Sequence, residues 1–240
     1  MAGTLKTEAI VLRSLRYSEA DRILHVYTPS LGRLGAIAKG VRKSNSRFGG
    51  RLEPFFRLHL VLYEGRGELF TVTGAETISG YPRLREHAAT LDSAARACDA
   101  VSRLFEAGDA NPAVYNLLTS QLALLDSAPE MATHANQLAF RLKLLLASGH
   151  APHLAACATC GEREGLTGYS GAAGGVVCSS CEASSFSFDQ EAHAFLTQAL
   201  ALPLAQTPQA TPRALSQAER AISETLEHHA QVRWRPAVTR

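Results

Sequence analysis

The first third of the chain has apolar and polar residues that alternate with a period of two. Between Leu5 and Glu76 this pattern is enriched in β-branched and aromatic residues, which is typical of half-buried strands. We predict five strands, at Thr4–Leu15, Arg22–Tyr27, Arg33–Lys39, Phe56–Tyr63 and Glu68–Ala75. Their number and length indicate an OB-type barrel, and an SH3-like barrel fits almost as well.

Beyond Tyr81 and Pro82 the apolar positions recur at intervals of three and four, which indicates amphipathic helices. Asn111 with Pro112 is typical of a helix start, and Ser187 opens a capping-box pattern. We predict helices at 83–107, 112–125, 132–148, 187–202 and 212–232. The predicted fold class is α+β multidomain, with an N-terminal all-β OB-type barrel at residues 1–80 and a mainly α-helical domain at 81–240.

Four of the five cysteines form two Cys-x-x-Cys pairs, Cys157 with Cys160 and Cys178 with Cys181, separated by seventeen glycine-rich residues. Two such pairs can complete a tetrahedral thiolate shell around zinc. We expect one structural ion, because four thiolates leave no position open for water. This zinc knuckle would be inserted into the helical domain at residues 154–185. A redox dithiol is the alternative, but neither pair opens a helix within a βαβ unit.

The long connection between the third and fourth predicted strands is strongly basic. Between Arg33 and Arg57, seven Lys or Arg residues accompany a single acid, Glu53. Glycine, serine and asparagine in the middle break any regular period, so we expect a loop that can follow a phosphate backbone. Phenylalanines lie among the charges, and aromatics can stack on bases. A solvated surface loop is the alternative. The candidate nucleic-acid-binding residues are Lys39, Arg42, Lys43, Arg47, Phe48, Arg51 and Arg57.

Charge is divided unevenly along the chain. Residues 1–80 contain twelve Lys or Arg and seven Asp or Glu, a net charge of +5, whereas the remainder has a net charge of −3. A basic N-terminal unit suits nucleic acid, and a mildly acidic remainder suits protein contacts. The sequence shows neither the apolar core of a signal peptide nor a stretch that could span a bilayer. We expect a cytoplasmic protein without membrane contacts.

The sequence also contains no familiar catalytic motif. It has no G-x-x-x-x-G-K-[ST] loop, no G-x-S-x-G and no G-x-G-x-x-G. The carboxylates of Glu19 and Asp21 lie between Arg16 and Arg22, where ion pairing is the expected role. These observations favour a binding protein over an enzyme.

Short strings in both parts of the chain form a recognisable combination. The N-terminal strings are Tyr17-Ser-Glu-Ala-Asp21, Ala38-Lys-Gly-Val-Arg-Lys-Ser44, Ser46-Arg-Phe48 and Leu52-Glu-Pro-Phe55. The later strings are Phe140-Arg-Leu-Lys-Leu-Leu-Leu-Ala-Ser-Gly149, Pro152 and Cys157-Ala-Thr-Cys160-Gly161. Together they resemble the RecO family of bacterial DNA repair and recombination mediators, and the resemblance covers the whole chain in the same order. The family's basic N-terminal loop corresponds to Lys39, Arg42, Lys43, Arg47 and Arg51.

The resemblance implies an OB-fold domain, a helical domain with a zinc knuckle, and binding of single- and double-stranded DNA. It also implies strand annealing and, at the nucleoid, work with RecR to place RecA on DNA coated by single-stranded-DNA-binding protein. Many members lack some of the cysteines, so the zinc expected here rests on the spacing in this chain. The alternative function is a zinc-stabilised OB-type module that binds RNA and a protein partner.

Overall fold

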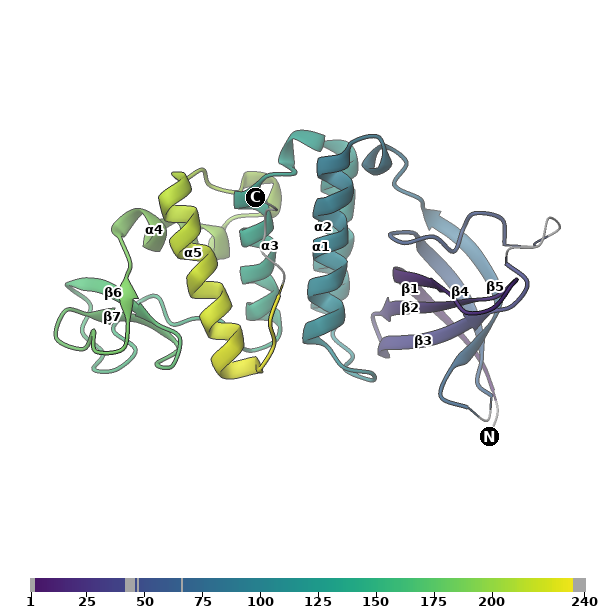
Figure 1. Ribbon diagram of the computed structural model, residues 1–240, viewed down its shortest axis with the longest axis horizontal. Helices are drawn as coiled ribbons and strands as arrows, with labels where there is room; N and C mark the ends of the chain where they lie inside the picture. Colours follow the sequence, from purple (N-terminus) through teal and green to yellow (C-terminus); the bar gives the residue numbers. More distant parts are fainter. Residues whose placement is uncertain (1–2, 42–45, 47, 66, 235–240) are drawn as a thin grey trace. The chain divides into compact units, whose positions relative to one another are not determined.

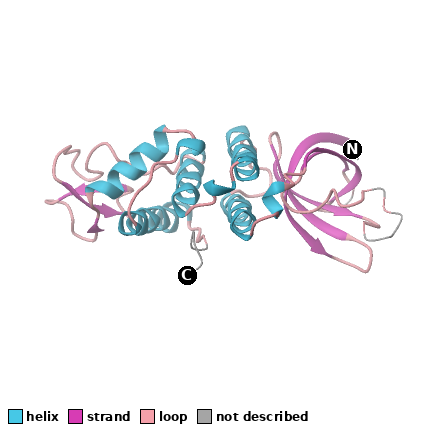
Figure 2. Cartoon of the chain, turned by 90° about the horizontal axis from the view of Figure 1, so that it is seen from above, coloured by secondary structure: helices cyan, strands magenta, loops and turns pink. Residues whose placement is uncertain are grey.

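A computed structural model describes residues 3–41, 46, 48–65 and 67–234 (Figure 1). The chain divides into two compact units, Met1–Pro129 and Glu130–Arg240. The first unit contains a barrel and two α-helices, and the second contains the remaining α-helices and a small sheet (Figure 2). The predicted boundary between domains at residues 80 and 81 stays a prediction.

The N-terminal barrel is closed, with the strand order β1-β2-β3-β5-β4. Antiparallel pairing joins β1 to both β2 and β4, and parallel pairing joins β3 to β5. This arrangement is that of an OB-type barrel, so the predicted fold is confirmed. The strands are β1 (Thr4–Arg16), β2 (Arg22–Thr28), β3 (Gly32–Ala38), β4 (Arg57–Tyr63) and β5 (Phe70–Ser79). β5 ends later than predicted, because Thr77 and Ser79 still pair with β4.

The barrel core consists of the inward residues of these strands. Leu24, Ala36 and Leu58 are fully buried there, as the strand alternation predicts. The connection from β3 to β4 adds Phe48 and Leu52 to the same core. Burial of each such side chain contributes about 1.5 to 3 kcal/mol to stability. Part of the basic connection is therefore fixed to the barrel.

Two helices, α1 (Ala88–Leu104) and α2 (Pro112–Ser127), follow a short 3₁₀ turn, η1 (Arg83–Arg85). The single helix predicted over 83–107 starts later, because His87 is extended and the Thr90 hydroxyl donates to the carbonyls of Leu84 and His87. Asn111 caps α2 by accepting the backbone N–H groups of Ala113 and Val114, as predicted.

In the second unit, α3 (His134–Ala147), α4 (Gln190–Ala201) and α5 (Pro212–Thr225) pack against one another. The predicted start of α4 at Ser187 is wrong, because Asp189 is the N-cap and accepts the N–H of Ala192 at 2.9 Å. α5 passes into a π-helical turn, η4 (Leu226–Ala230). Two further 3₁₀ turns are η2 (Pro129–Met131) and η3 (Leu204–Gln206).

A three-stranded sheet of order β7-β6-β8 lies between α3 and α4 in the sequence. Its strands are β6 (Leu166–Ser170), β7 (Gly175–Cys178) and β8 (Phe186–Ser187). The sequence predicted only a glycine-rich knuckle for this segment. Within the described part of the chain, no helix is long and apolar enough to cross a membrane.

Candidate functional site

The connection between β3 and β4 is pinned at both ends to the hairpin of β1 and β2. At its start, the Gly40 N–H donates to the Asp21 carboxylate at 2.8 Å. At its end, Glu53 forms an ion pair with Arg22 at 2.8 Å. Sequence reasoning missed both anchoring acids. The sequence offered a signal for each acid. Glu53 is the single acid of a basic segment, which suits an ion pair, and Asp21 lies in a hairpin turn, where a carboxylate can accept a backbone N–H.

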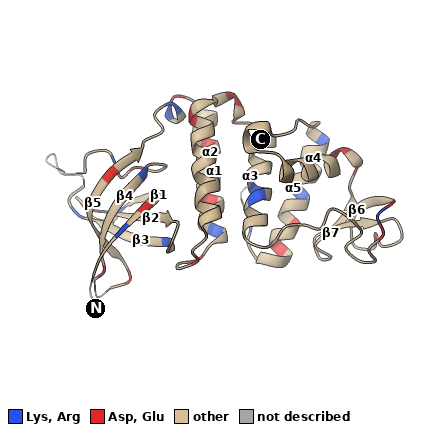
Figure 3. Cartoon of the chain, turned by 180° about the vertical axis from the view of Figure 1, so that it is seen from behind, with Lys and Arg blue, Asp and Glu red and all other residues tan. Residues whose placement is uncertain are grey.

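The structure describes only some of the Lys and Arg residues in this connection. Lys39 and Arg51 are exposed, and the positions of Lys and Arg on the barrel can be followed in Figure 3. Arg51 also donates to the carbonyl of Phe48 at 3.3 Å. The predicted residues Arg42, Lys43 and Arg47 lie outside the described residues. The two described cations can therefore face a polyanion in solution.

The structure corrects the role predicted for Phe48. Its side chain is 2% exposed and belongs to the barrel core. Phe55 is also buried, and Arg85 lies over Phe56 with its guanidinium carbon 4.8 Å from the ring centroid. Stacking requires a ring face that a base can reach. The phenylalanine residues of the basic connection therefore pack within the first unit. Phe48 is removed from the set of candidate nucleic-acid-binding residues.

Arg57 also has a different place from the predicted one. Its guanidinium donates to the Glu8 carboxylate at 2.7 Å, and the Tyr115 hydroxyl donates to the same carboxylate oxygen at 3.0 Å. Bonding from Arg57 lowers the pKa of Glu8, although burial opposes the shift. This contact joins β1, β4 and α2. We therefore assign Arg57 to the packing of the first unit and leave it out of the candidate nucleic-acid-binding set.

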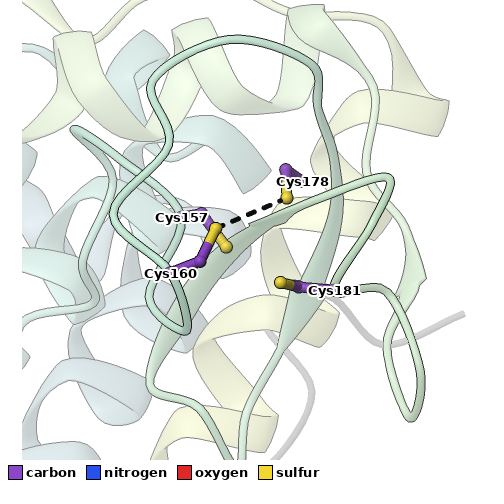
Figure 4. Close-up of side chains that lie close together, drawn as sticks. All are labelled: Cys157, Cys160, Cys178 and Cys181. Atoms are coloured by element: carbon purple, nitrogen blue, oxygen red, sulfur yellow. Dashed lines mark hydrogen bonds between the residues drawn. The ribbon is translucent and has the colours of Figure 1, made fainter.

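The four paired cysteines lie together in the second unit. Their sulfur atoms all lie within 4.8 Å of one another, and Sγ of Cys160 is 3.7 Å from Sγ of Cys178. Figure 4 shows the side chains converging from two loops. Tetrahedral zinc with bonds of about 2.3 Å would set its sulfur ligands about 3.8 Å apart. The donor set and its spacing therefore fit one metal ion, which Cys157, Cys160, Cys178 and Cys181 could hold.

Backbone turns bring the thiols together. The Gly161 N–H donates to the Cys157 carbonyl, and the Cys181 N–H to the Cys178 carbonyl, both at 2.9 Å. Gly161 has φ +81°, a conformation that glycine adopts without strain. The backbone N–H of Cys178 lowers the pKa of Cys157 to about 6, whereas contact with the Cys160 thiol raises the pKa of Cys181 to about 12. The lowered pKa of Cys157 favours its thiolate, which is the form of cysteine that binds a metal ion.

The two loops that carry the cysteines are connected to the helices through the small sheet. Cys178 ends β7, which pairs with β6. On β6, the buried Tyr169 ring lies 5.3 Å from Phe188, and its hydroxyl is hydrogen-bonded to Thr225 of α5 at 2.5 Å. Disturbing the cysteine cluster should therefore affect the packing of α5.

Two family models match the chain over most of its length. The model described as recombination protein O N terminal matches residues 1–81, and the one described as recombination protein O C terminal matches residues 85–236. The chain belongs to the RecO family. It is 38% identical over 224 residues to the DNA repair protein RecO of Rubrobacter xylanophilus. This alignment covers 90% of this chain and 88% of that relative.

Two further RecO proteins agree with this result. The protein of Geobacter sulfurreducens is 36% identical, in an alignment that covers 74% of this chain and 72% of that relative. The protein of Myxococcus xanthus is 35% identical, in an alignment that covers 72% of this chain and 71% of that relative. Membership of the RecO family supports a role in DNA repair and recombination. RecO is a family of recombination mediators and is not known as an enzyme family.

Proposed function

We propose that this protein binds single- and double-stranded DNA through the connection between β3 and β4 and anneals complementary strands without breaking a bond. The observation that carries the proposal is the basic connection on a closed OB-type barrel. OB-type barrels often bind oligonucleotides. The proposed contact residues are Lys39, Arg42, Lys43, Arg47 and Arg51.

Phosphate contacts suit annealing because they are independent of sequence. Neutralisation by Lys and Arg reduces the repulsion between two strands that must approach each other. Such contacts also weaken as salt increases, which allows release after pairing. We further propose that the protein works with RecR to load RecA on DNA coated by single-stranded-DNA-binding protein, in the cytoplasm at the nucleoid.

For the cysteine cluster we propose one structural zinc ion. Zinc prefers four thiolates in tetrahedral geometry, and a shell of four protein ligands leaves no position for a substrate. When bound, the ion would fix two loops that carry many glycines and little core. We propose no direct role for the ion in annealing.

Annealing of complementary strands coated with single-stranded-DNA-binding protein, without ATP, tests the proposal. We expect acceleration by the intact protein and little by a variant with the five contact residues replaced by glutamine. A variant with the exposed residues Arg83, Arg103, Arg163, Arg213 and Arg233 replaced by glutamine serves as a control of equal charge change. No acceleration by the intact protein would refute annealing. Tighter binding to RNA than to DNA, again without annealing, would favour the RNA-binding alternative.

A further inference from the structure

The four clustered cysteines differ in their access to solvent. Cys160 is exposed and Cys181 is partly exposed, whereas Cys157 and Cys178 are buried. Buried cysteines are usually inert, and oxidation is selective for those that solvent reaches. A small oxidant in solution can therefore reach Cys160 more readily than the two buried thiols.

Cys160 also faces a thiol of the other loop. Its Sγ lies 3.7 Å from Sγ of Cys178, as the dashed line in Figure 4 marks. A disulfide bond is about 2.05 Å long, so the two sulfur atoms need to approach by only about 1.7 Å. An accessible cysteine with a second thiol beside it is the usual arrangement in a redox sensor. A bond here would join the two Cys-x-x-Cys pairs to each other.

Backbone hydrogen bonds hold the two loops together independently of the sulfur atoms. The Ala158 N–H, within the first pair, donates to the Val176 carbonyl at 2.8 Å. The Ser179 N–H, within the second pair, donates to the Gly165 carbonyl at 3.1 Å. Oxidation of a thiol removes neither bond. The cysteines therefore stay close to one another, and reduction can restore the cluster of four thiols.

The apolar core around the cluster is small and consists largely of the cysteines themselves. Its buried members are Cys157, Val177 and Cys178, and Leu166 and Cys181 pack against them. So few apolar contacts give little stability of their own, and a bound zinc ion would supply much of the local folding free energy. Loss of two thiolates should therefore loosen β6 and β7.

We propose that Cys160 and Cys178 form a peroxide-sensitive switch that releases the zinc ion. The proposal rests on the zinc ion proposed above. The Cys160 thiolate attacks one oxygen of hydrogen peroxide, which gives a sulfenic acid and hydroxide. The Cys178 thiolate then displaces a second hydroxide from that sulfur, and the disulfide forms. The two sulfur atoms lose an electron pair, and the peroxide gains it.

Oxidation would leave only Cys157 and Cys181 as zinc ligands. A structural zinc ion is held by four ligands, so the ion dissociates. Loosening of β6 reaches α5, because the hydroxyl of Tyr169 is hydrogen-bonded to Thr225. The first unit contains only Cys98, which is buried in α1. The switch therefore acts on the second unit and leaves the barrel and its basic connection unchanged.

Titration of the zinc-loaded protein with hydrogen peroxide tests the switch. A chromogenic chelator should detect release of about one zinc per chain for about two thiols lost. Peptide mapping should find a disulfide between Cys160 and Cys178 and an unmodified Cys98. Amide hydrogen exchange should become faster in β6 and β7 and stay the same in the barrel strands. A thiol reductant with added zinc should restore the original exchange.

Cys160→His is the informative variant, because three cysteines and one histidine are also a common structural zinc shell. It should bind zinc and lose most of the peroxide-dependent release at the dose that empties the wild-type protein. Cys98→Ala removes a thiol outside the cluster and should release zinc as the wild-type protein does.

The switch is overturned if peroxide leaves zinc bound to the wild-type protein, or if Cys160→His releases zinc as readily as the wild type. It is also overturned if mapping of the oxidised wild-type protein finds the disulfide within one Cys-x-x-Cys pair, a result that needs no variant. Protein that binds no zinc would overturn the ion and the switch together, whereas zinc that peroxide does not release would overturn only the switch.

Discussion

Neutralising the basic connection should flatten the salt dependence of DNA binding by a predictable amount. Lys39 and Arg51 are exposed, and with Arg42, Lys43 and Arg47 they make five proposed phosphate contacts. At about 0.7 per contact, the log-log slope for single strands should be roughly −3.5. Replacing Lys39 and Arg51 by glutamine should reduce it to roughly −2.1. The assay is fluorescence anisotropy of a labelled oligonucleotide at several salt concentrations.

Arg57 supplies the sharpest control for this experiment. It carries the same charge and lies at the end of the same basic segment, but it is bonded to Glu8. Arg57→Gln should lower the free energy of unfolding and leave the slope near −3.5 for the folded protein. A slope that falls as much for Arg57→Gln as for a single substitution at Lys39 would refute our assignment. An unchanged slope after replacing Lys39 and Arg51 would place the phosphate contacts elsewhere.

Three further predictions concern the scaffold. Metal analysis should find about one zinc per chain, and replacing Cys157 and Cys160 by serine should remove it and lower solubility; metal-free wild-type protein with full stability would contradict this. Phe48→Ala should destabilise the barrel by about 3 to 5 kcal/mol in denaturant unfolding, and a variant of normal stability with weak DNA binding would restore the stacking role. Glu8 has a lowered pKa in the folded state, so its contribution is present above its unfolded pKa and lost as pH falls through the folded value. The difference in melting temperature between wild type and Glu8→Gln should therefore shrink in acid, and a constant difference would argue against the ion pair.

The strand and helix patterns predicted most of the fold because each element buries one face. Leu24, Ala36 and Leu58 are buried where the alternation placed them, and Asn111 caps its helix as its type suggests. The break at His87 was not predictable from periodicity, since it depends on a hydrogen bond from Thr90 to Leu84. The small sheet was missed because its strands are short and contain glycine, which weakens a strand pattern.

The candidate site was predicted in part. The spacing of the cysteines was sufficient to predict their cluster, because each pair forms a local turn. The aromatic residues were misleading, since composition cannot show whether Phe48 faces solvent or the barrel interior.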